Sequence, residues 1–199
     1  MISLLQIDYD MFRFINGLAG HSNVLDGTMR FFSQQAEYLF FIGILVYWLT
    51  RSKTNRLMVL EALTSACTAF GVGFLVSHIV YRDRPFVVHS VHQLIEHAAN
   101  ASFPSDHAIG AFVISVSIWT FRRKEGWVWL GLAVCIAFSR IWTGVHYPTD
   151  VMMGAIIGVV SSIFIHFLFA KSRYIRTCTS ACLTLWEKLE RRLGIKWGA

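Results

Sequence analysis

The chain has 199 residues, of which 55% are hydrophobic and 15% are charged, and its formal net charge is +6. A soluble domain of this size carries about a quarter charged residues, so the composition excludes an ordinary water-soluble protein and predicts an all-α integral membrane protein. The basic residues form short clusters between apolar runs and do not line one face, which argues against nucleic acid as a partner.

Residues 1–32 are predicted to form an interfacial or re-entrant helix on the outer membrane surface. Leu4, Leu5 and Met11 give this segment an apolar face, whereas Asp8 and Asp10 interrupt any run long enough to span a bilayer. A basic region followed by a continuous apolar core is missing, so we expect no cleavable signal peptide.

Five apolar stretches follow, each close to the roughly 20 residues that a helix needs to cross hydrocarbon. We therefore predict one membrane domain, with a core of about five transmembrane helices over residues 33–170 and a tail over residues 171–199. The stretches are residues 33–50, 57–81, 104–121, 127–145 and 151–170.

Three clusters of basic residues predict the orientation of this bundle. With five crossings, all three clusters fall on the same side, which the positive-inside rule assigns to the cytoplasm. The loop over residues 82–103 and the turn around residues 146–148 then face outward, and residues 177–197 are expected to form a cytoplasmic amphipathic helix on anionic lipid. The clusters are Arg51, Lys53 and Arg56; Arg122, Arg123 and Lys124; and Lys171, Arg173 and Arg176.

Each of the three prolines lies beside charged or histidine residues at an outward end of a predicted crossing, at Pro85, Pro104 and Pro148. Proline suits the first turn of a helix, and two of the three are expected to begin helices. Ser105 and His107 would then lie in the first turn of the third crossing. The free N–H groups and the positive dipole end of such a turn attract an anion.

The stretch RIWTGVHYPTD, residues 140–150, gathers Arg140, His146 and Asp150 in an apolar part of the chain. Ionisable residues at such a depth are costly and are typical of a shared function. If Pro148 begins the last crossing, the Asp150 carboxylate can bond one imidazole nitrogen of His146 and leave the other as a nucleophile or a base. Arg140 and Arg84 together can bind a phosphoryl group.

These stretches resemble the three signature motifs of the type-2 phosphatidic acid phosphatase superfamily. The matching residues are RPF (84–86), PSDH (104–107) and SRIWTGVHYPTD (139–150), in the same order and with the same internal gaps. More narrowly, residues 82–107 resemble the BcrC branch, which comprises undecaprenyl-pyrophosphate phosphatases associated with bacitracin resistance. The resemblance extends over residues 10–165.

The resemblance implies a phosphatase of the bacterial plasma membrane that acts on undecaprenyl pyrophosphate at the outer face, with no metal or other cofactor. It implies that His146 is the nucleophile that forms a phosphohistidine and that Asp150 orients it. His107 is expected to protonate the leaving group. The phosphoryl oxygens are expected to be held by Arg84, Ser105 and Arg140.

Two positions depart from the superfamily pattern. Ser77 stands where the broad family has a lysine, so one phosphate contact is missing or supplied elsewhere. Asp106 replaces a preferred glycine, and its carboxylate should repel a phosphate unless it points away or is protonated. Asp106, His97 and Arg82 are therefore candidates for contacts specific to the substrate or to the branch.

Three other functions remain open. The first is a phospholipid phosphatase acting on phosphatidylglycerophosphate or phosphatidic acid. The second is an exporter of bacitracin or metal without hydrolysis. A metal transporter or a metallohydrolase is suggested because His89, His92 and Glu96 would share one face of a helix, although a connecting loop favours packing or a contact with the distal phosphate. The third is an intramembrane serine protease, which is disfavoured because Ser105 and His107, two residues apart, do not face each other on a helix.

Overall fold

The computed structural model describes residues 4–193, and within that range the chain forms nine helices and no strand. The predicted all-α architecture is confirmed for these residues. The helices are α1 (Leu4–Asn16), α2 (Asn23–Gln34), α3 (Ala36–Leu49), α4 (Lys53–Ile79), α5 (Pro85–Val88), α6 (Asp106–Phe121), α7 (Arg123–Trp142), α8 (Pro148–Lys171) and α9 (Arg173–Arg192).

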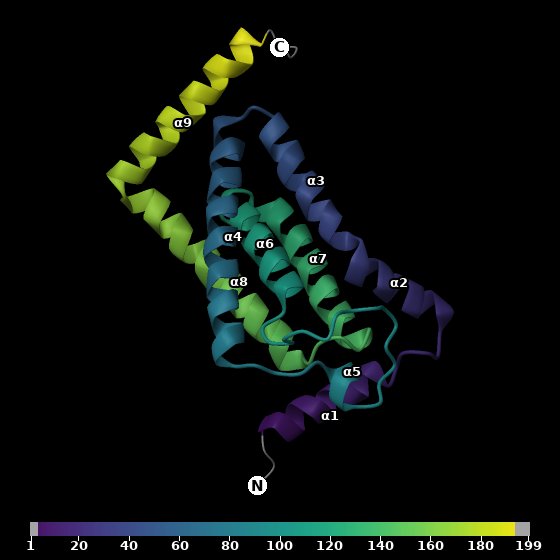
Figure 1. Cartoon of the computed structure of the whole chain (residues 1–199). Coiled ribbons are helices and arrows are strands. Elements are labelled where there is room, and N and C mark those ends of the chain that lie inside the picture. Colours follow the sequence, from purple (N-terminus) through teal and green to yellow (C-terminus); the bar gives the residue numbers. More distant parts are fainter. Residues whose placement is uncertain (1–3, 194–199) are drawn as a thin grey trace.

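Helix α6 forms the centre of the bundle and packs against α4, α7 and α8 (Figure 1). The close approach of α6 and α8 depends on two glycines. A Cβ at Gly154 would lie 2.5 Å from the carbonyl oxygen of Ser105, and a Cβ at Gly158 would lie 2.8 Å from that of Ile109. Small residues let helix backbones approach closely within a membrane, so these glycines bring the first turn of α6 against α8.

Three described helices, α4, α7 and α8, are long and apolar enough to cross a membrane, and α3 and α6 are shorter apolar helices. Large apolar side chains cover the outside of the bundle; Phe74 is 62% exposed and Phe167 is 52% exposed. Such a surface suits a protein whose solvent is lipid. The first predicted crossing differs in detail, because Ser33 belongs to α2 and Gln35 separates α2 from α3.

The N-terminal segment forms two helices, α1 and α2, where a single interfacial helix was predicted. Helix α1 lies across the end of the bundle at which α8 begins (Figure 1). Its exposed face carries Leu4 and Phe14, whereas Asp8, Phe12 and Asn16 are buried. Of the two acidic residues that interrupt the apolar run, Asp8 therefore faces the bundle, whereas Asp10 is exposed.

Two of the three prolines begin helices, as predicted, but Pro104 is not one of them. Pro85 and Pro148 occupy the first turns of α5 and α8. Pro104 is not helical, because α6 begins at Asp106 with Ser105 as its N-cap residue. Ser105 thus caps the helix that it was expected to join, and His107 lies in the first turn as predicted.

Helix α9 extends beyond the opposite end of the bundle from α1 (Figure 1). It has exposed apolar side chains at Tyr174 and Leu185. The carboxylate of Glu190 lies 2.7 Å from the guanidinium of the buried Arg56 and fastens α9 to α4. The predicted amphipathic tail helix is thus present up to Arg192, and residues 194–197 of that prediction lie outside the described residues.

Candidate active site

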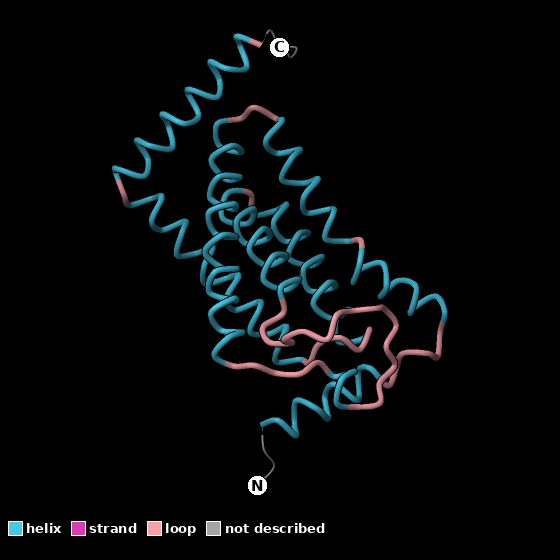
Figure 2. The backbone as a smooth tube through the Cα atoms, in the orientation of Figure 1, coloured by secondary structure: helices cyan, strands magenta, loops and turns pink. Residues whose placement is uncertain are grey.

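Long loop segments gather at the α1 end of the bundle (Figure 2). Arg84 precedes α5, Ser102 lies near the end of the loop that leads to α6, and His146 lies in the turn between α7 and α8. All three are buried, with exposed fractions of 5%, 0% and 2%. The turn that carries His146 depends on Gly144, whose φ of 82° and close approach to a backbone oxygen suit only glycine.

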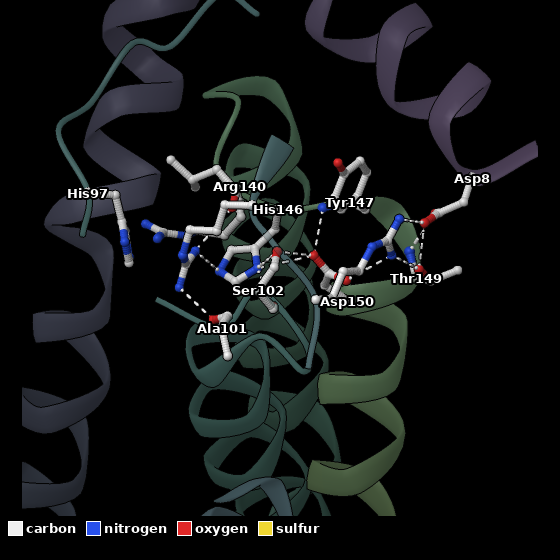
Figure 3. A network of polar contacts seen from close by, with 12 residues as sticks. Asp8, His97, Ala101, Ser102, Arg140, His146, Tyr147, Thr149 and Asp150 are labelled. Atoms are coloured by element: carbon white, nitrogen blue, oxygen red, sulfur yellow. Dashed lines mark hydrogen bonds and ion pairs between the residues drawn. The ribbon is translucent and has the colours of Figure 1, made fainter. Parts of the chain in front are cut away.

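The imidazole of His146 is held from both sides (Figure 3). Nδ1 lies 2.9 Å from the carbonyl oxygen of Ser102, and Nε2 lies 3.0 Å from Nη1 of Arg84. A guanidinium can only donate hydrogen bonds, so Nε2 must be the acceptor. Nδ1 therefore carries the proton and donates it to Ser102, which leaves the lone pair of Nε2 on the side of Arg84.

The surroundings of His146 keep it neutral. Burial lowers the pKa of His146 well below 6.5, and the positive charges of Arg140 and Arg84 lower this pKa further. Burial also lowers the pKa of His97, whose ring centroid lies 6.3 Å from that of His146. Both imidazoles are then uncharged at neutral pH, as a nucleophilic nitrogen requires.

The Asp150 carboxylate lies in the first turn of α8, as predicted, but its main partners differ from the predicted ones. Oδ2 accepts hydrogen bonds from the Ser102 hydroxyl at 2.5 Å and from the Tyr147 amide at 2.8 Å. The distance from Oδ2 to Nδ1 of His146 is 3.5 Å, longer than that from Nδ1 to the Ser102 carbonyl. The first turn of α8 directs the carboxylate back toward its own N-cap residue, Tyr147, so Ser102 provides the shorter contact to the imidazole.

Arg140 and Ser105 offer unused hydrogen-bond donors. Arg140 is 1% exposed, and only its Nη1 is bonded, to the carbonyl and the hydroxyl oxygen of Ser33 at 2.8 Å each. Its Nε and Nη2, and the hydroxyl of the fully buried Ser105, have no hydrogen-bond partner within residues 4–193. Buried donors without partners are costly, so these groups are suited to an anion with several oxygens.

His107 is paired with a residue that the sequence analysis did not single out. Its Nε2 lies 3.3 Å from a carboxylate oxygen of Glu37, on α3. Both residues line a cavity of about 260 Å³ between α3, α4 and α6 whose other walls are mainly apolar. Among the hydrogen bonds and ion pairs of residues 4–193, none joins His107 directly to His146 or Arg84.

The two departures from the superfamily pattern meet in one place. Ser77 and Asp106 both line a second cavity, of about 350 Å³, together with Asn100 and Ala101. Asn100 and Ala101 also accept hydrogen bonds from Arg84, at 2.9 and 3.2 Å. The missing lysine and the added carboxylate therefore change the charge of the same space next to Arg84.

The loop that carries His89, His92 and Glu96 does not form the helix that a row of metal ligands requires. The ring of His89 stacks on Tyr9 at 4.0 Å, and the backbone of His92 exchanges hydrogen bonds with the Asn16 amide. In the part of the chain that the structure describes, no three His, Cys, Asp or Glu residues are placed to hold a metal ion. The fold uses this loop for packing against α1.

Comparison with known proteins agrees with the motif arrangement. A family model described as the PAP2 superfamily matches residues 58–174, more than half of the chain, and this range contains Arg84, His107 and His146. The chain belongs to the PAP2 superfamily. The predicted resemblance is confirmed at the level of the family.

Relatives of this PAP2 protein include two BcrC proteins. It is 39% identical over 193 residues to the bacitracin transport permease protein BcrC of Bacillus licheniformis, which covers 96% of this chain and 93% of that one. It is 35% identical over 191 residues to the undecaprenyl-diphosphatase BcrC of Bacillus subtilis (strain 168), which covers 96% of this chain and 97% of that one. The narrower resemblance to the BcrC branch is also confirmed.

Two crystal structures share the PAP2 fold of this chain. That of Aquifex aeolicus LpxE has a TM-score of 0.69 and 22% sequence identity, and covers 80% of this chain and 94% of that one. That of a PAP2 type phosphatidylglycerolphosphate phosphatase from Bacillus subtilis has a TM-score of 0.61 and 18% identity, and covers 86% and 89%. The likeness to these two structures shows a shared helical fold.

Proposed function

We propose that the protein hydrolyses undecaprenyl pyrophosphate to undecaprenyl phosphate and inorganic phosphate at the outer face of the bacterial plasma membrane. This activity would recycle the cell-wall lipid carrier and confer bacitracin resistance. The similarity to two BcrC proteins supports the substrate. The observation that carries the chemistry is the unprotonated Nε2 of His146, which accepts a hydrogen bond from Arg84, close to the unpartnered donors of Arg140 and Ser105.

In the first step, Nε2 of His146 attacks the terminal phosphorus, and the bond to the bridging oxygen breaks. A phosphohistidine forms. The hydrogen bond that Nδ1–H donates to the Ser102 carbonyl stabilises the positive charge that develops on the ring. Arg84, Arg140 and Ser105 would stabilise the negative oxygens of the transferring group.

In the second step, water cleaves the phosphohistidine. His107, which would already have donated a proton to the departing lipid phosphate in the first step, would now act as a base and take a proton from the attacking water. Asp150 would hold the position of Ser102 and His146. The positive charge of two guanidinium groups would serve the role that a metal has in other phosphoryl transfers, so no metal or other cofactor is required.

The membrane arrangement that fits this function has five crossings, formed by α3, α4, α6, α7 and α8, within one membrane domain. The three basic clusters would lie on the cytoplasmic side together with α9, and α1 would lie on the outer surface. The mainly apolar cavity beside His107 would then accept part of a long isoprenoid chain while the head group reaches His146.

Two alternatives remain as outcomes of the test. A phospholipid phosphatase would use the same site on a different head group, as the name of the second structural neighbour suggests for that protein. An exporter without hydrolysis would fit the name of the Bacillus licheniformis relative. Secondary transporters place their binding groups at broken helices in the middle of the membrane, whereas here Arg84, His146 and Asp150 lie at helix ends and loops.

The decisive experiment measures phosphate release by the purified protein in detergent, with undecaprenyl pyrophosphate and phosphatidic acid in parallel and with or without EDTA. We expect EDTA-resistant release from the pyrophosphate, loss of this release in His146→Ala, and its survival in Ser77→Ala. Faster phosphate release from phosphatidic acid would contradict undecaprenyl pyrophosphate as the substrate. No release from either lipid by the folded protein would favour an exporter.

A further inference from the structure

We infer that Asp8, on the N-terminal helix α1, is a positioning residue of the active site and acts through Arg82 on Asp150. The inference rests on the proposed function, because its readout is turnover at His146. Asp8 lies outside the residues that the family model matches, and it is buried although α1 lies at the end of the bundle.

The Asp8 carboxylate binds the start of α8. It is 3% exposed, and Oδ1 accepts a hydrogen bond from the Thr149 amide at 2.9 Å. Oδ2 accepts one from the Thr149 hydroxyl at 2.7 Å and lies 2.7 Å from Nη2 of Arg82. Asp8 thus satisfies a free amide in the first turn of a helix that begins 140 residues later in the sequence, next to Asp150.

Arg82 bridges two buried carboxylates. Its Nη1 lies 3.1 Å from Oδ1 of Asp150 and 2.8 Å from the hydroxyl of Thr149, while Nη2 binds Asp8. The guanidinium also lies 3.6 Å from the ring centroid of Tyr147, which fixes its plane. A planar guanidinium held in this way can fix the positions of both carboxylates relative to each other.

The contacts continue from Asp150 to the nucleophile. Asp150 binds the Ser102 hydroxyl, and the Ser102 carbonyl accepts the proton on Nδ1 of His146. Figure 3 shows Asp8, Thr149, Asp150, Ser102 and His146 along this line of contacts. Without the charge of Asp8, the Arg82 cation would have Asp150 as its main anionic partner and would draw that carboxylate away from Ser102.

Asp8 is not needed simply to attach α1 to the bundle. The other half of α1 has its own anchors: Phe12 is 1% exposed in the core, and the Asn16 amide donates to the carbonyls of Trp142 at 2.8 Å and of His92 at 2.9 Å. A buried carboxylate is expensive to keep, and these anchors attach α1 without it. Its position between Arg82 and Thr149 points to the active site.

The test compares steady-state phosphate release from undecaprenyl pyrophosphate by wild type, Asp8→Asn, Arg82→Gln and the double variant. We expect Asp8→Asn to lower kcat at least about tenfold with KM within about twofold, because the Asp8 carboxylate is buried and bonded to Thr149 and Arg82 and a small displacement of the nucleophile is costly. The kcat of the double variant should be no more than about twofold below that of the less active single variant, because both changes break the same line of contacts.

The matched control is Asp10→Asn, since Asp10 is an exposed carboxylate on the same helix. Its kcat should equal that of wild type. Unchanged kcat in Asp8→Asn, or losses that multiply in the double variant, would overturn the inference. A fall in kcat for Asp10→Asn as large as that for Asp8→Asn would do the same.

If Asp8→Asn does not fold, Arg82→Lys replaces it. Lysine keeps the charge and loses the fork that reaches both carboxylates, so the same fall in kcat at constant KM is expected, and unchanged kcat overturns the inference. Wild-type protein without phosphate release overturns the proposed function and this inference with it. Wild-type turnover with normal turnover in the Asp8 variant overturns only the inference.

Discussion

The guanidinium of Arg84 donates a hydrogen bond to Nε2 of His146 across 3.0 Å. This contact places a positive group next to Nε2, the nitrogen that would attack the phosphorus in the proposed mechanism. It keeps a proton off that nitrogen, because a second cation beside a buried guanidinium is unfavourable. A phosphoryl oxygen that enters the site can take over the same N–H group, which would release the lone pair of Nε2 next to its target.

The pH dependence of turnover follows from this relationship. His146 attacks only when it is neutral, and its pKa lies well below 6.5 because of burial and the charges of Arg140 and Arg84. Activity should therefore be retained as the pH falls through 6.5 and be lost only when it passes the lowered pKa. The acid limb of kcat/KM, which reports the free enzyme, measures this.

Replacement of Arg84 should move that acid limb. In Arg84→Gln one of the charges that lower the pKa of His146 is gone, so the limb should shift to higher pH, in addition to a large loss of rate. The ionisation of the substrate is the same for both proteins, so the difference between their profiles reports the enzyme. Coincident limbs would contradict the assigned protonation state of His146.

Arg140 is expected to act as an anion ligand. Arg140→Gln should lower kcat/KM at least about 100-fold, the usual cost of removing a donor that stabilises transition-state charge. Phosphate at millimolar concentration should raise the thermal unfolding midpoint of the wild type in detergent, because a ligand of the native state stabilises it, and should not raise that of the variant. Arg13→Gln, which changes an exposed cation of α1, is the control and should keep the response.

Ser102 should matter for both turnover and stability. Ser102→Ala removes the 2.5 Å hydrogen bond from its hydroxyl to the buried Asp150 but keeps the backbone carbonyl that accepts from His146. We expect kcat to fall about tenfold. The free energy of unfolding should fall by about 2 kcal/mol, since the bond involves a charged group. Turnover and denaturation of the purified variant check both values, and turnover equal to wild type would exclude a role of the hydroxyl.

The leaving group should determine how much His107 contributes. Undecaprenyl phosphate leaves as a phosphate whose last pKa is about 6, whereas phosphatidic acid must release a far more basic alkoxide. His107→Ala should therefore reduce kcat/KM at least about tenfold more with phosphatidic acid than with undecaprenyl pyrophosphate. Glu37→Gln should produce the same pattern in a weaker form, because Glu37 lies 3.3 Å from Nε2 of His107. Equal losses on both lipids would contradict the acid role.

The class of protein and the identity of the motif residues could be predicted from the amino-acid sequence alone. Apolar run lengths depend on bilayer thickness, and the start of α8 at Pro148 with Asp150 in its first turn depends on local backbone geometry, so both could be predicted. The amphipathic pattern of the tail likewise predicted a helix, and α9 occupies most of that range. Each of these features follows from residues close together in the chain.

The contacts that connect the residues of the site depend on how distant parts of the chain pack together. Ser102 reaches Asp150 from 48 residues away, and Asp8 reaches Thr149 from 141 residues away. Such contacts follow from how helices pack, above all from the approach of α6 to α8 at Gly154. In the sequence, Asp8 is only a charge that interrupts an apolar helix. Folding turns that charge inward, because the start of α8 and Arg82 supply the donors that a buried carboxylate requires.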